Sequence, residues 1–480
     1  MIGAGIAGLA SAVRLAALGH EVTVLEQAAA AGGKCGRVEL GGYRFDSGAS
    51  LVTMPWVFAE LFAATGGALD DELELMRVEP GTSYRFADGS SLRLGADLAP
   101  TLDELDRWSA GAAEDWVRFL GTAAQMWRAS QPFLDGPPPW PPRRPRPGER
   151  TPDPRDLARV RPWQTLRGLA RRRARDPRLR LVIERFATYA GADPRRAPAA
   201  LALAGYVEHA FGAWHVRGGI YALVEALTRR LADLGDELRL QAAVERICLS
   251  GGRVEAVECG GERIPCEVVV SSADAERLDG ELLGQAPRPR RERSLSGFAL
   301  MLGVRGRTPG LAHHNILFPS DYDAEFDDVF VHRRPVRDPT IYLAASSVSD
   351  AAEAPPDCEN WFVLVNAPTQ GDGLDWDFHA DAYEQALLDR LAARGLDPRA
   401  RLEVRARRTP ADLERETGAA GGAIYGAAPH GRLGTLGRPG NRSPAARGLY
   451  LVGGTTHPGG GLPLVALSAK IVATEVGPAV

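Results

Sequence analysis

The residues with the clearest chemical potential are three glycines at the start of the chain. Gly3, Gly5 and Gly8 form a G-x-G-x-x-G set, and an apolar helical face follows them. In a dinucleotide-binding unit the first glycine turns tightly, the second lets backbone approach a pyrophosphate, and the third packs helix on strand. The helix N-terminus, with the amides of Ile6 and Ala7, supplies the positive end for the phosphates. This arrangement predicts a dinucleotide site.

A carboxylate follows at the distance that such a site requires. Residues 22–25 read as a buried strand that ends on Glu26, eighteen residues beyond Gly8. A carboxylate in this place can accept both ribose hydroxyls, and we assign Gln27 to the same edge of the site. Because an acid here disfavours a 2′-phosphate, NADP is not expected.

A second glycine-rich loop indicates which dinucleotide is bound. Gly33 lies in the segment 32–37, Gly-Gly-Lys-Cys-Gly-Arg, in which Lys34 and Arg37 add positive charge near the diphosphate. The segment resembles the G-G-x-x-x-R loop of two-dinucleotide-domain flavoproteins. We therefore predict FAD rather than NAD.

The start of the chain departs from the usual arrangement. A Rossmann unit needs a strand before the first glycine, and only Met1 and Ile2 precede Gly3. We expect either a misplaced start or a truncated chain. We also expect this chain to be less stable, and to hold flavin less tightly, than one with about five more apolar residues, a typical strand length.

Composition excludes several classes of protein. A chain of 480 residues suggests two or three domains, and a net charge of −4 gives no reason to expect nucleic acid. The five cysteines are an odd number without a C-x-x-C, so neither disulfides nor a metal site is predicted, and a reducing cytoplasm fits. There is no signal peptide and no run of eighteen apolar residues that would mark a spanning helix.

Alternation of apolar and polar residues predicts the remaining elements. We expect a β-hairpin at 83–94, helix over 101–134, helix again within 186–235, and strands between 238 and 274. A second sheet-based domain is expected over 295–420, with a helix at 380–394. A last buried strand at 448–454 and a closing helix from Pro463 end the chain.

The segment 143–185 concentrates positive charge. It holds fifteen arginines against five acids, and apolar residues are interleaved with them, namely Trp163, Leu166, Leu169, Leu179, Leu181, Val182 and Phe186. A basic, tryptophan-bearing amphipathic region suits an anionic membrane surface, where each arginine contributes about 1 kcal/mol. The alternative is a solvated, partly disordered insertion.

Taken together, these features resemble a bacterial carotenoid desaturase of the phytoene desaturase type, an FAD-dependent branch of the amine-oxidase-like flavoproteins. The ending Gly-Gly-Thr-Thr-His-Pro-Gly-Gly-Gly-Leu-Pro at 453–463 is far more specific than the first glycine set. Matching segments span nearly the whole chain and include both glycine loops, 51–55, 188–191, 210–214, 217–223, 313–316, 359–368 and 450–463. The chain departs from the family at Ala49, where proline is common.

The resemblance implies an α/β fold in three regions. A Rossmann-type FAD-binding domain is expected from 1–75, 218–285 and 420–480, and a mixed-sheet substrate domain from 76–110 and 286–419. A helical membrane-facing subdomain is expected from 111–217. Since that subdomain contains the arginine-rich segment, the resemblance favours the membrane interpretation.

The resemblance also implies a reaction. Desaturation of phytoene or a related acyclic carotenoid removes two hydrogens beside a polyene, with hydride passing to flavin N5 and oxygen or a quinone reoxidising the flavin. A polyene delocalises the resulting cation, so the protein must mainly supply positioning and exclusion of water. A forty-carbon hydrocarbon gains about 0.8 kcal/mol per buried carbon group. The enzyme must therefore draw substrate from a bilayer, and we expect peripheral attachment to the inner face of the cell membrane.

Further cofactor contacts follow from the family pattern. Val244 would pair by backbone with the adenine, and amides near Leu462 would stabilise negative charge at the reduced flavin. The glycines of the C-terminal loop let backbone approach the isoalloxazine, and Pro463 suits a first helical turn. The remaining residues assigned to the cofactor are Ser50, Leu51, Gly453 and Gly454.

No catalytic residue is assigned. Glu208 is a conceivable proton acceptor, although a solvated or capping carboxylate is the favoured interpretation. His457 is favoured as a loop-fixing residue over a base. His313 and His314 are expected to be structural, because no third ligand follows at metal spacing.

Other functions stay open. A carotenoid isomerase, saturase or oxygenase would share these motifs, and segment 161–166 resembles 1-hydroxycarotenoid 3,4-desaturases. A non-catalytic prenyl-binding escort protein of the GDP-dissociation-inhibitor kind would share the fold, but Glu26, Lys34, Arg37 and the glycine-rich ending favour flavin binding. An amine oxidase is disfavoured because its usual C-terminal flavin motif is absent.

Overall fold

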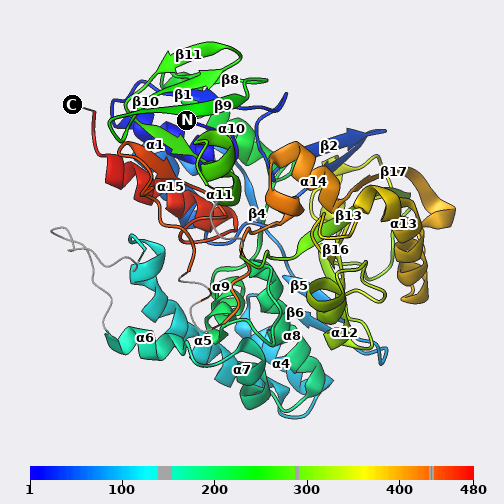
Figure 1. Ribbon diagram of the computed structural model, residues 1–480. Helices are drawn as coiled ribbons and strands as arrows, with labels where there is room; N and C mark the ends of the chain where they lie inside the picture. The colour runs from blue at the N-terminus through cyan, green and yellow to red at the C-terminus, as the bar shows by residue number, and fades with distance from the viewer. Residues whose placement is uncertain (139–153, 287–290, 432–433, 435–436, 480) are drawn as a thin grey trace.

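The computed structural model describes residues 1–138, 154–286, 291–431, 434 and 437–479. Three regions are visible in Figure 1. A parallel sheet with its helices lies at the top left, a large mixed sheet lies at the right, and a group of helices lies at the bottom. The predicted α/β class, with a Rossmann-type part, a mixed sheet and a helical part, is confirmed.

The parallel sheet is organised around the first two residues. β1 (Thr23–Leu25) pairs with β8 (Glu237–Arg239), and β12 (Val269–Ser271) pairs with β18 (Leu449–Leu451). Ile2 forms parallel bridges to both pairs, at Leu25 and Ser271. Its amide donates to the Val270 carbonyl at 2.9 Å. Met1 and Ile2 therefore occupy the central position that a Rossmann strand would fill, and the gain expected from a longer strand stays a prediction.

Both faces of this sheet are buried, as expected for parallel strands. Val24 and Val270 face a core shared with α1 (Ile6–Ala17), α2 (Pro55–Ala64), α10 (Tyr221–Asp233) and α15 (Leu462–Val476). Leu25 and Val269 face the opposite way, toward a three-stranded antiparallel sheet of β9 (Val244–Ser250), β10 (Arg253–Cys259) and β11 (Glu262–Pro265).

The second sheet has seven strands. Their order is β17 (Leu402–Arg408), β13 (Ser296–Arg305), β16 (Cys358–Ala367), β15 (Ile341–Ala344), β14 (His314–Leu317), β5 (Thr82–Arg85) and β6 (Ser91–Leu94). Only β14 and β5 pair in parallel. One face packs on α13 (Trp376–Ala393).

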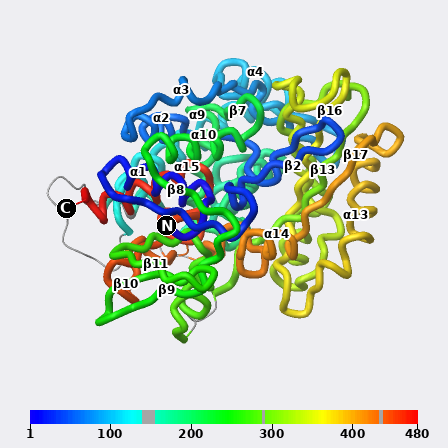
Figure 2. Tube along the Cα trace, turned by 90° about the horizontal axis from the view of Figure 1, so that it is seen from above, coloured from blue at the N-terminus to red at the C-terminus, as the bar shows by residue number. Residues whose placement is uncertain are grey.

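The other face of the seven-stranded sheet receives a hairpin from the N-terminal region. β2 (Arg37–Leu40) and β3 (Tyr43–Asp46) carry Tyr43 and Phe45 onto Ala299 and Met301 of β13. Figure 2 shows this hairpin lying beside β13 and β16. Separate pairing joins β4 (Leu75–Arg77) to β7 (Trp214–Val216). The hairpin that follows the second glycine-rich loop thus contacts the seven-stranded sheet.

The helical region contains α4 (Leu98–Trp108), α5 (Ala112–Leu134), α6 (Pro154–Val160), α7 (Leu166–Arg173), α8 (Pro177–Glu184) and α9 (Leu203–Phe211). Short 3₁₀ helices η1 (Arg185–Ala190) and η2 (Ala199–Ala202) connect them. The prediction of helix over 101–134 is wrong in one respect. The structure has two helices there, separated at Ser109–Gly111, because Gly111 takes φ +75° and Ser109 is extended.

The arginine-rich segment is folded wherever the structure describes it. Leu166, Leu179 and Phe186 lie in the core of the helical region, whereas Trp163 is 61% exposed. Arg167 pairs with Glu184 at 2.7 Å, and Arg175 pairs with Asp115 at 3.0 Å. Most apolar side chains of the segment are therefore interior packing rather than an outward face, and the described part is not a disordered insertion. Residues 143–153 lie outside the described residues.

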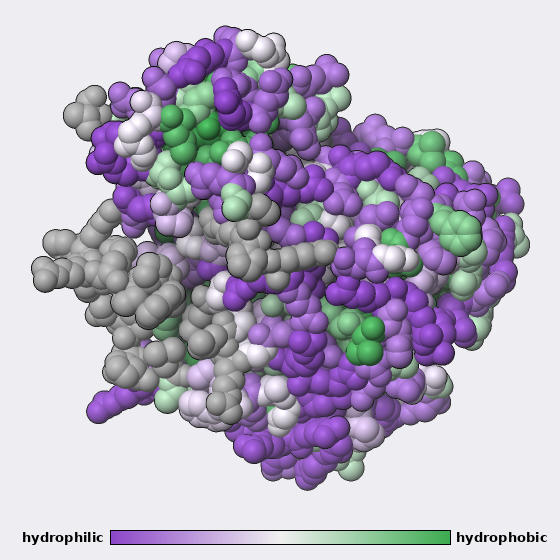
Figure 3. Space-filling model, viewed as in Figure 1, coloured by the Kyte–Doolittle hydropathy of each residue, from purple (hydrophilic) through white to green (hydrophobic). Residues whose placement is uncertain are grey.

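Surface composition agrees with this packing. In Figure 3 hydrophilic residues cover most of the visible helical region, and apolar residues occur as small separate patches. Among the described residues, no helix is long and apolar enough to cross a membrane.

Candidate functional site

The two N-terminal glycine loops pack against each other and form a cradle. Gly5 bridges to Gly32, and the Gly32 amide donates to the Ala4 carbonyl at 2.9 Å. Gly3 has φ +87°, and a Cβ on Gly8 would lie 2.0 Å from the Gly3 carbonyl oxygen. These two glycines are therefore required by the chain itself.

Gly5 differs from its neighbours. Among the described residues, a Cβ there would meet only the Gly32 carbonyl oxygen, at 3.8 Å, and no side chain caps the N-terminus of α1. Uncapped amides and free space at one helix start suit a phosphate group. The cradle thus fits the pyrophosphate of a dinucleotide, with Ile6 and Ala7 in the first turn.

Glu26 lies at the end of β1, as expected. Its Oε2 accepts from the Ala4 amide at 2.6 Å, and its Oε1 accepts from the Ala28 amide at 2.9 Å. Each carboxylate oxygen has a further lone pair, so these bonds leave acceptor capacity for a ribose. Gln27 is exposed at the same edge.

Lys34 and Arg37 have protein partners. The Lys34 ammonium donates to the carbonyls of Ala423 and Ile424 at 3.0 and 2.7 Å, and burial lowers its pKa to about 8. Arg37 lies over the Tyr221 ring, at 4.8 Å from the centroid, and pairs with Glu225 at 3.1 Å. Their assignment to the diphosphate stays a prediction.

Two further assigned segments lie on different elements. The Ser50 hydroxyl is 2.5 Å from the Tyr342 hydroxyl on β15, so the loop carrying Ser50 and Leu51 touches the seven-stranded sheet. Val244 is half-buried at the start of β9, opposite Cys259. Their roles toward the cofactor stay predictions.

The C-terminal loop is contacted by a buried cation that sequence reasoning missed. Arg438 donates through one nitrogen, Nη1, to the carbonyls of Tyr425 and Gly454, both at 2.8 Å, and burial lowers its pKa to about 10. Gly453, at φ +116°, and Gly454 precede α15, which begins at Leu462 with Pro463 in its first turn. No spacing rule distinguishes Arg438 from the many other arginines of the chain.

Asp46, which ends β3, was not assigned a role from the sequence. Its carboxylate accepts from the amides of Ile220 and Tyr221, at 2.8 and 3.2 Å. It thereby caps α10 and holds the 217–221 loop. The sequence gives only a weak signal for this contact, because Asp46 and Ile220 are 174 residues apart.

The two catalytic candidates have different surroundings. Glu208 accepts from the Tyr189 hydroxyl, and burial raises its pKa even though Arg185 lies nearby and opposes the shift. It is bonded within the helical region rather than solvated. His457 is buried, its Nε2 lies 3.0 Å from the Gly136 carbonyl oxygen, and burial lowers its pKa to about 4. The His457 contact fixes the C-terminal loop. A chemical role for Glu208 or for His457 stays a prediction.

His313 and His314 are buried, with contacts to Ser349 and Tyr342 at 2.8 Å each. The structure also gathers three residues that the sequence did not connect, namely His215, Asp350 and Glu353.

Comparison with known proteins identifies the class. The model of the family described as flavin containing amine oxidoreductase matches residues 6–296, and the chain belongs to this family. The expectations of FAD as cofactor and of an oxidoreductase are thereby confirmed at the level of the family.

Individual relatives narrow the branch. The chain is 34% identical to a zeta-carotene-forming phytoene desaturase of Myxococcus xanthus, over 98% of this chain and 92% of the relative. It is 36% identical to a hydroxyneurosporene desaturase of Rubrivivax gelatinosus, with the same two coverages. The resemblance to carotenoid desaturases is confirmed.

Solved structures show the same fold. A putrescine oxidase bound to putrescine superposes with a TM-score of 0.66 at 17% identity, covering 99% of this chain and 97% of that one. At this identity the match shows the fold alone.

Proposed function

We propose that the protein is an FAD-dependent carotenoid desaturase that introduces double bonds into phytoene or a related acyclic carotenoid. The observation that carries the proposal is similarity to two carotenoid desaturases over 98% of the chain. The cradle around Gly5 supports it, because it leaves room for a dinucleotide. When bound, the flavin supplies the hydride acceptor.

The chain would bind the polyene on an aromatic cluster, which we define as Trp56, Trp127, Tyr206 and Phe211. The ring centroids of Trp56 and Phe211 are 4.5 Å apart. The Trp127 centroid lies 5.6 Å from that of Phe211 and 6.4 Å from that of Tyr206. Trp56 is 41% exposed and comes five residues after Leu51. Large, rigid apolar rings between α2, α5 and α9 suit a long hydrocarbon next to the flavin-side loop.

The polar groups near this cluster offer little for strong base catalysis. The Glu208 carboxylate already accepts a hydrogen bond from Tyr189. In this proposal the chain's residues orient the polyene and exclude water, and Glu208 receives the proton that follows hydride loss.

The substrate class also supports contact with a membrane. A carotenoid partitions into lipid because burial of each carbon group contributes about 0.8 kcal/mol. We propose peripheral attachment to the inner face of the cell membrane, through exposed Trp163 and the neighbouring arginines Arg171 and Arg172. Oxygen or a quinone is the proposed final electron acceptor.

The test uses the purified protein and anionic liposomes loaded with phytoene. Desaturation predicts a protein-bound flavin spectrum and new pigments that absorb at longer wavelength. Bound flavin with geometric isomers alone would support an isomerase. If phytoene is unchanged and only hydroxylated carotenoids are converted, the result would support the 3,4-desaturase alternative. A protein that purifies without the colour of bound flavin would support the escort alternative and contradict the proposal.

A further inference from the structure

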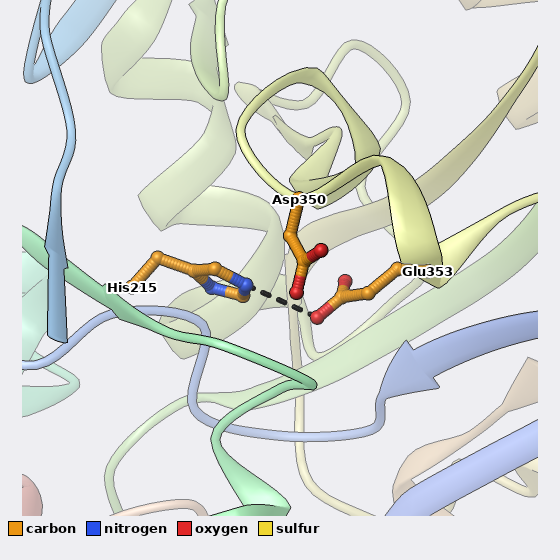
Figure 4. Close-up of side chains that lie close together, drawn as sticks. All are labelled: His215, Asp350 and Glu353. Carbon is orange, nitrogen blue, oxygen red and sulfur yellow. Dashed lines mark ion pairs between the residues drawn. The ribbon is translucent and has the colours of Figure 1, made fainter. Parts of the chain in front are cut away.

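Three buried side chains of the kind that bind metals meet between the two sheets. His215 comes from β7, and Asp350 and Glu353 come from the turn at η6 (Ala351–Glu353) (Figure 4). One ligand atom of each lies within 4.8 Å of the other two, and His215 Nε2 is 3.0 Å from Glu353 Oε1. Each residue is at most 2% exposed. Their ligand atoms therefore converge on one point in the interior.

The cluster contains polar atoms without hydrogen-bond partners. Among the described residues, Nδ1 of His215 has no partner, and Nε2 of His215 and Oε1 of Glu353 have none beyond their own 3.0 Å ion pair. The other oxygen of Glu353 is engaged, since it accepts from Asn360 Nδ2 at 3.2 Å and from the Ser346 hydroxyl. An unsatisfied buried polar atom costs about 1–3 kcal/mol. The orphaned Nδ1 of His215 and the second lone pair of Glu353 Oε1 therefore leave room for a group that the protein chain does not itself supply.

Charge leads to the same conclusion. Two buried carboxylates face one imidazole and the Arg217 guanidinium, which lies 3.9 Å from Asp350. Arg217 is half exposed and makes a shorter pair, 2.6 Å, with Glu74. Buried carboxylates are ordinarily paired or bound to a metal ion. A divalent cation would balance the charge that Arg217 leaves uncompensated.

We propose that His215, Asp350 and Glu353 bind one divalent transition-metal ion. An imidazole nitrogen with two carboxylate oxygens is a donor set typical of zinc, manganese or ferrous iron. The ion acts as a structural tie between β7 and the 350–353 turn. Asp350 Oδ2 also accepts from the Gly218 amide at 2.8 Å, so the tie fixes the 217–221 loop as well.

The test is metal analysis of the purified full-length flavoprotein, before and after exposure to Zn²⁺ or Mn²⁺ followed by dialysis. We expect about one ion per chain in the wild type and less than about a tenth of that in His215→Gln and Glu353→Gln. Glu353→Gln retains an oxygen that can accept from Asn360, so it keeps the local hydrogen bonding. Chelation is expected to lower the melting temperature of the wild type and to leave that of Glu353→Gln unchanged.

A matched control is available outside the cluster. His430 Nδ1 lies 2.8 Å from Glu292 Oε2, which makes a histidine–carboxylate pair of similar geometry. Glu292→Gln is expected to keep the metal. The proposal is overturned if the wild type binds no more of either ion than Glu353→Gln does, or if chelation leaves its melting temperature unchanged. In that event His215 and Glu353 form only a buried ion pair.

Discussion

The carboxylate of Asp46 lies 2.8 Å from the amide nitrogen of Ile220. Asp46 ends β3, at the base of the hairpin that reaches the seven-stranded sheet, and Ile220 precedes α10 of the parallel-sheet region. This hydrogen bond thus connects the β2–β3 hairpin to the start of α10.

Asp46 makes stability depend on pH. Burial raises its pKa from 3.8 to about 7, so the folded protein binds a proton that the unfolded chain releases. Its contribution to stability is therefore greatest below about pH 4, falls as pH rises to 7, and is constant above that. Asp46→Asn removes this titration and keeps an oxygen acceptor. Melting temperatures from pH 4 to 8 should show the wild type losing stability relative to Asp46→Asn as pH rises. A constant difference across that range would be inconsistent with a raised pKa.

The cradle predicts a difference between two neighbouring glycines. Gly5 has φ −68° and ψ 171°, which alanine adopts freely, and its Cβ would face open space. Gly5→Ala is therefore expected to fold normally and to weaken FAD binding at least about tenfold, or 1.4 kcal/mol. Gly8→Ala should lower the melting temperature of the apoprotein, because its Cβ would clash with Gly3. Flavin titration and thermal unfolding measure both effects. Normal FAD affinity in Gly5→Ala would remove the pyrophosphate from this position.

The aromatic cluster predicts separate effects on substrate and flavin. Trp56→Ala and Phe211→Ala each remove one of two rings whose centroids are 4.5 Å apart. We expect about a tenfold loss of turnover on carotenoid, because each ring contributes about 0.5–1.5 kcal/mol beyond its buried area, with unchanged flavin content. Phe378→Ala, at an 81% exposed residue on α13, is the control. Loss of activity in Phe378→Ala equal to that in Trp56→Ala would show that the cluster has no special role.

Membrane contact is tested by co-sedimentation with anionic vesicles. Trp163→Ala combined with Arg171→Glu and Arg172→Glu is expected to reduce binding more than tenfold, since each arginine near the surface contributes about 1 kcal/mol. Arg253→Glu, exposed on the three-stranded sheet, changes charge at a distant element and should have little effect. If the wild type, the triple variant and Arg253→Glu all sediment alike, the membrane contact does not involve Trp163, Arg171 and Arg172.

Local patterns predicted much of the fold because they report burial and turn chemistry. The glycines at 3, 5 and 8 placed α1, and alternation at 83–94 predicted the hairpin that β5 and β6 form. Spacing did not show which apolar residues of the arginine-rich segment face the core, and contact with a membrane stays a prediction. Leu166, Leu179 and Phe186 alternate with arginines in the sequence, but they pack on Phe119 and its neighbours. Which side of a short helix meets a core depends on chain that lies elsewhere.

The site was predictable only where its residues are close in sequence. Glu26 and both glycine-rich loops lie within residues 3–37, so spacing identifies them. His215 and Glu353 are 138 positions apart and meet because β7 and the η6 turn are brought together by the two sheets. Arg438 has no motif at all. Tertiary packing brings such residues together, and rules based on spacing along the sequence do not describe it.

The central claim is that this chain transfers hydride from a carotenoid to bound FAD. The most direct measurement is anaerobic mixing of the FAD-loaded protein with liposomes that contain phytoene, followed by absorbance of the flavin and pigment analysis. The account predicts bleaching of the oxidised flavin, matched mole for mole by new double bonds in the carotenoid. Flavin that stays oxidised while the carotenoid is unchanged or merely isomerised would contradict it.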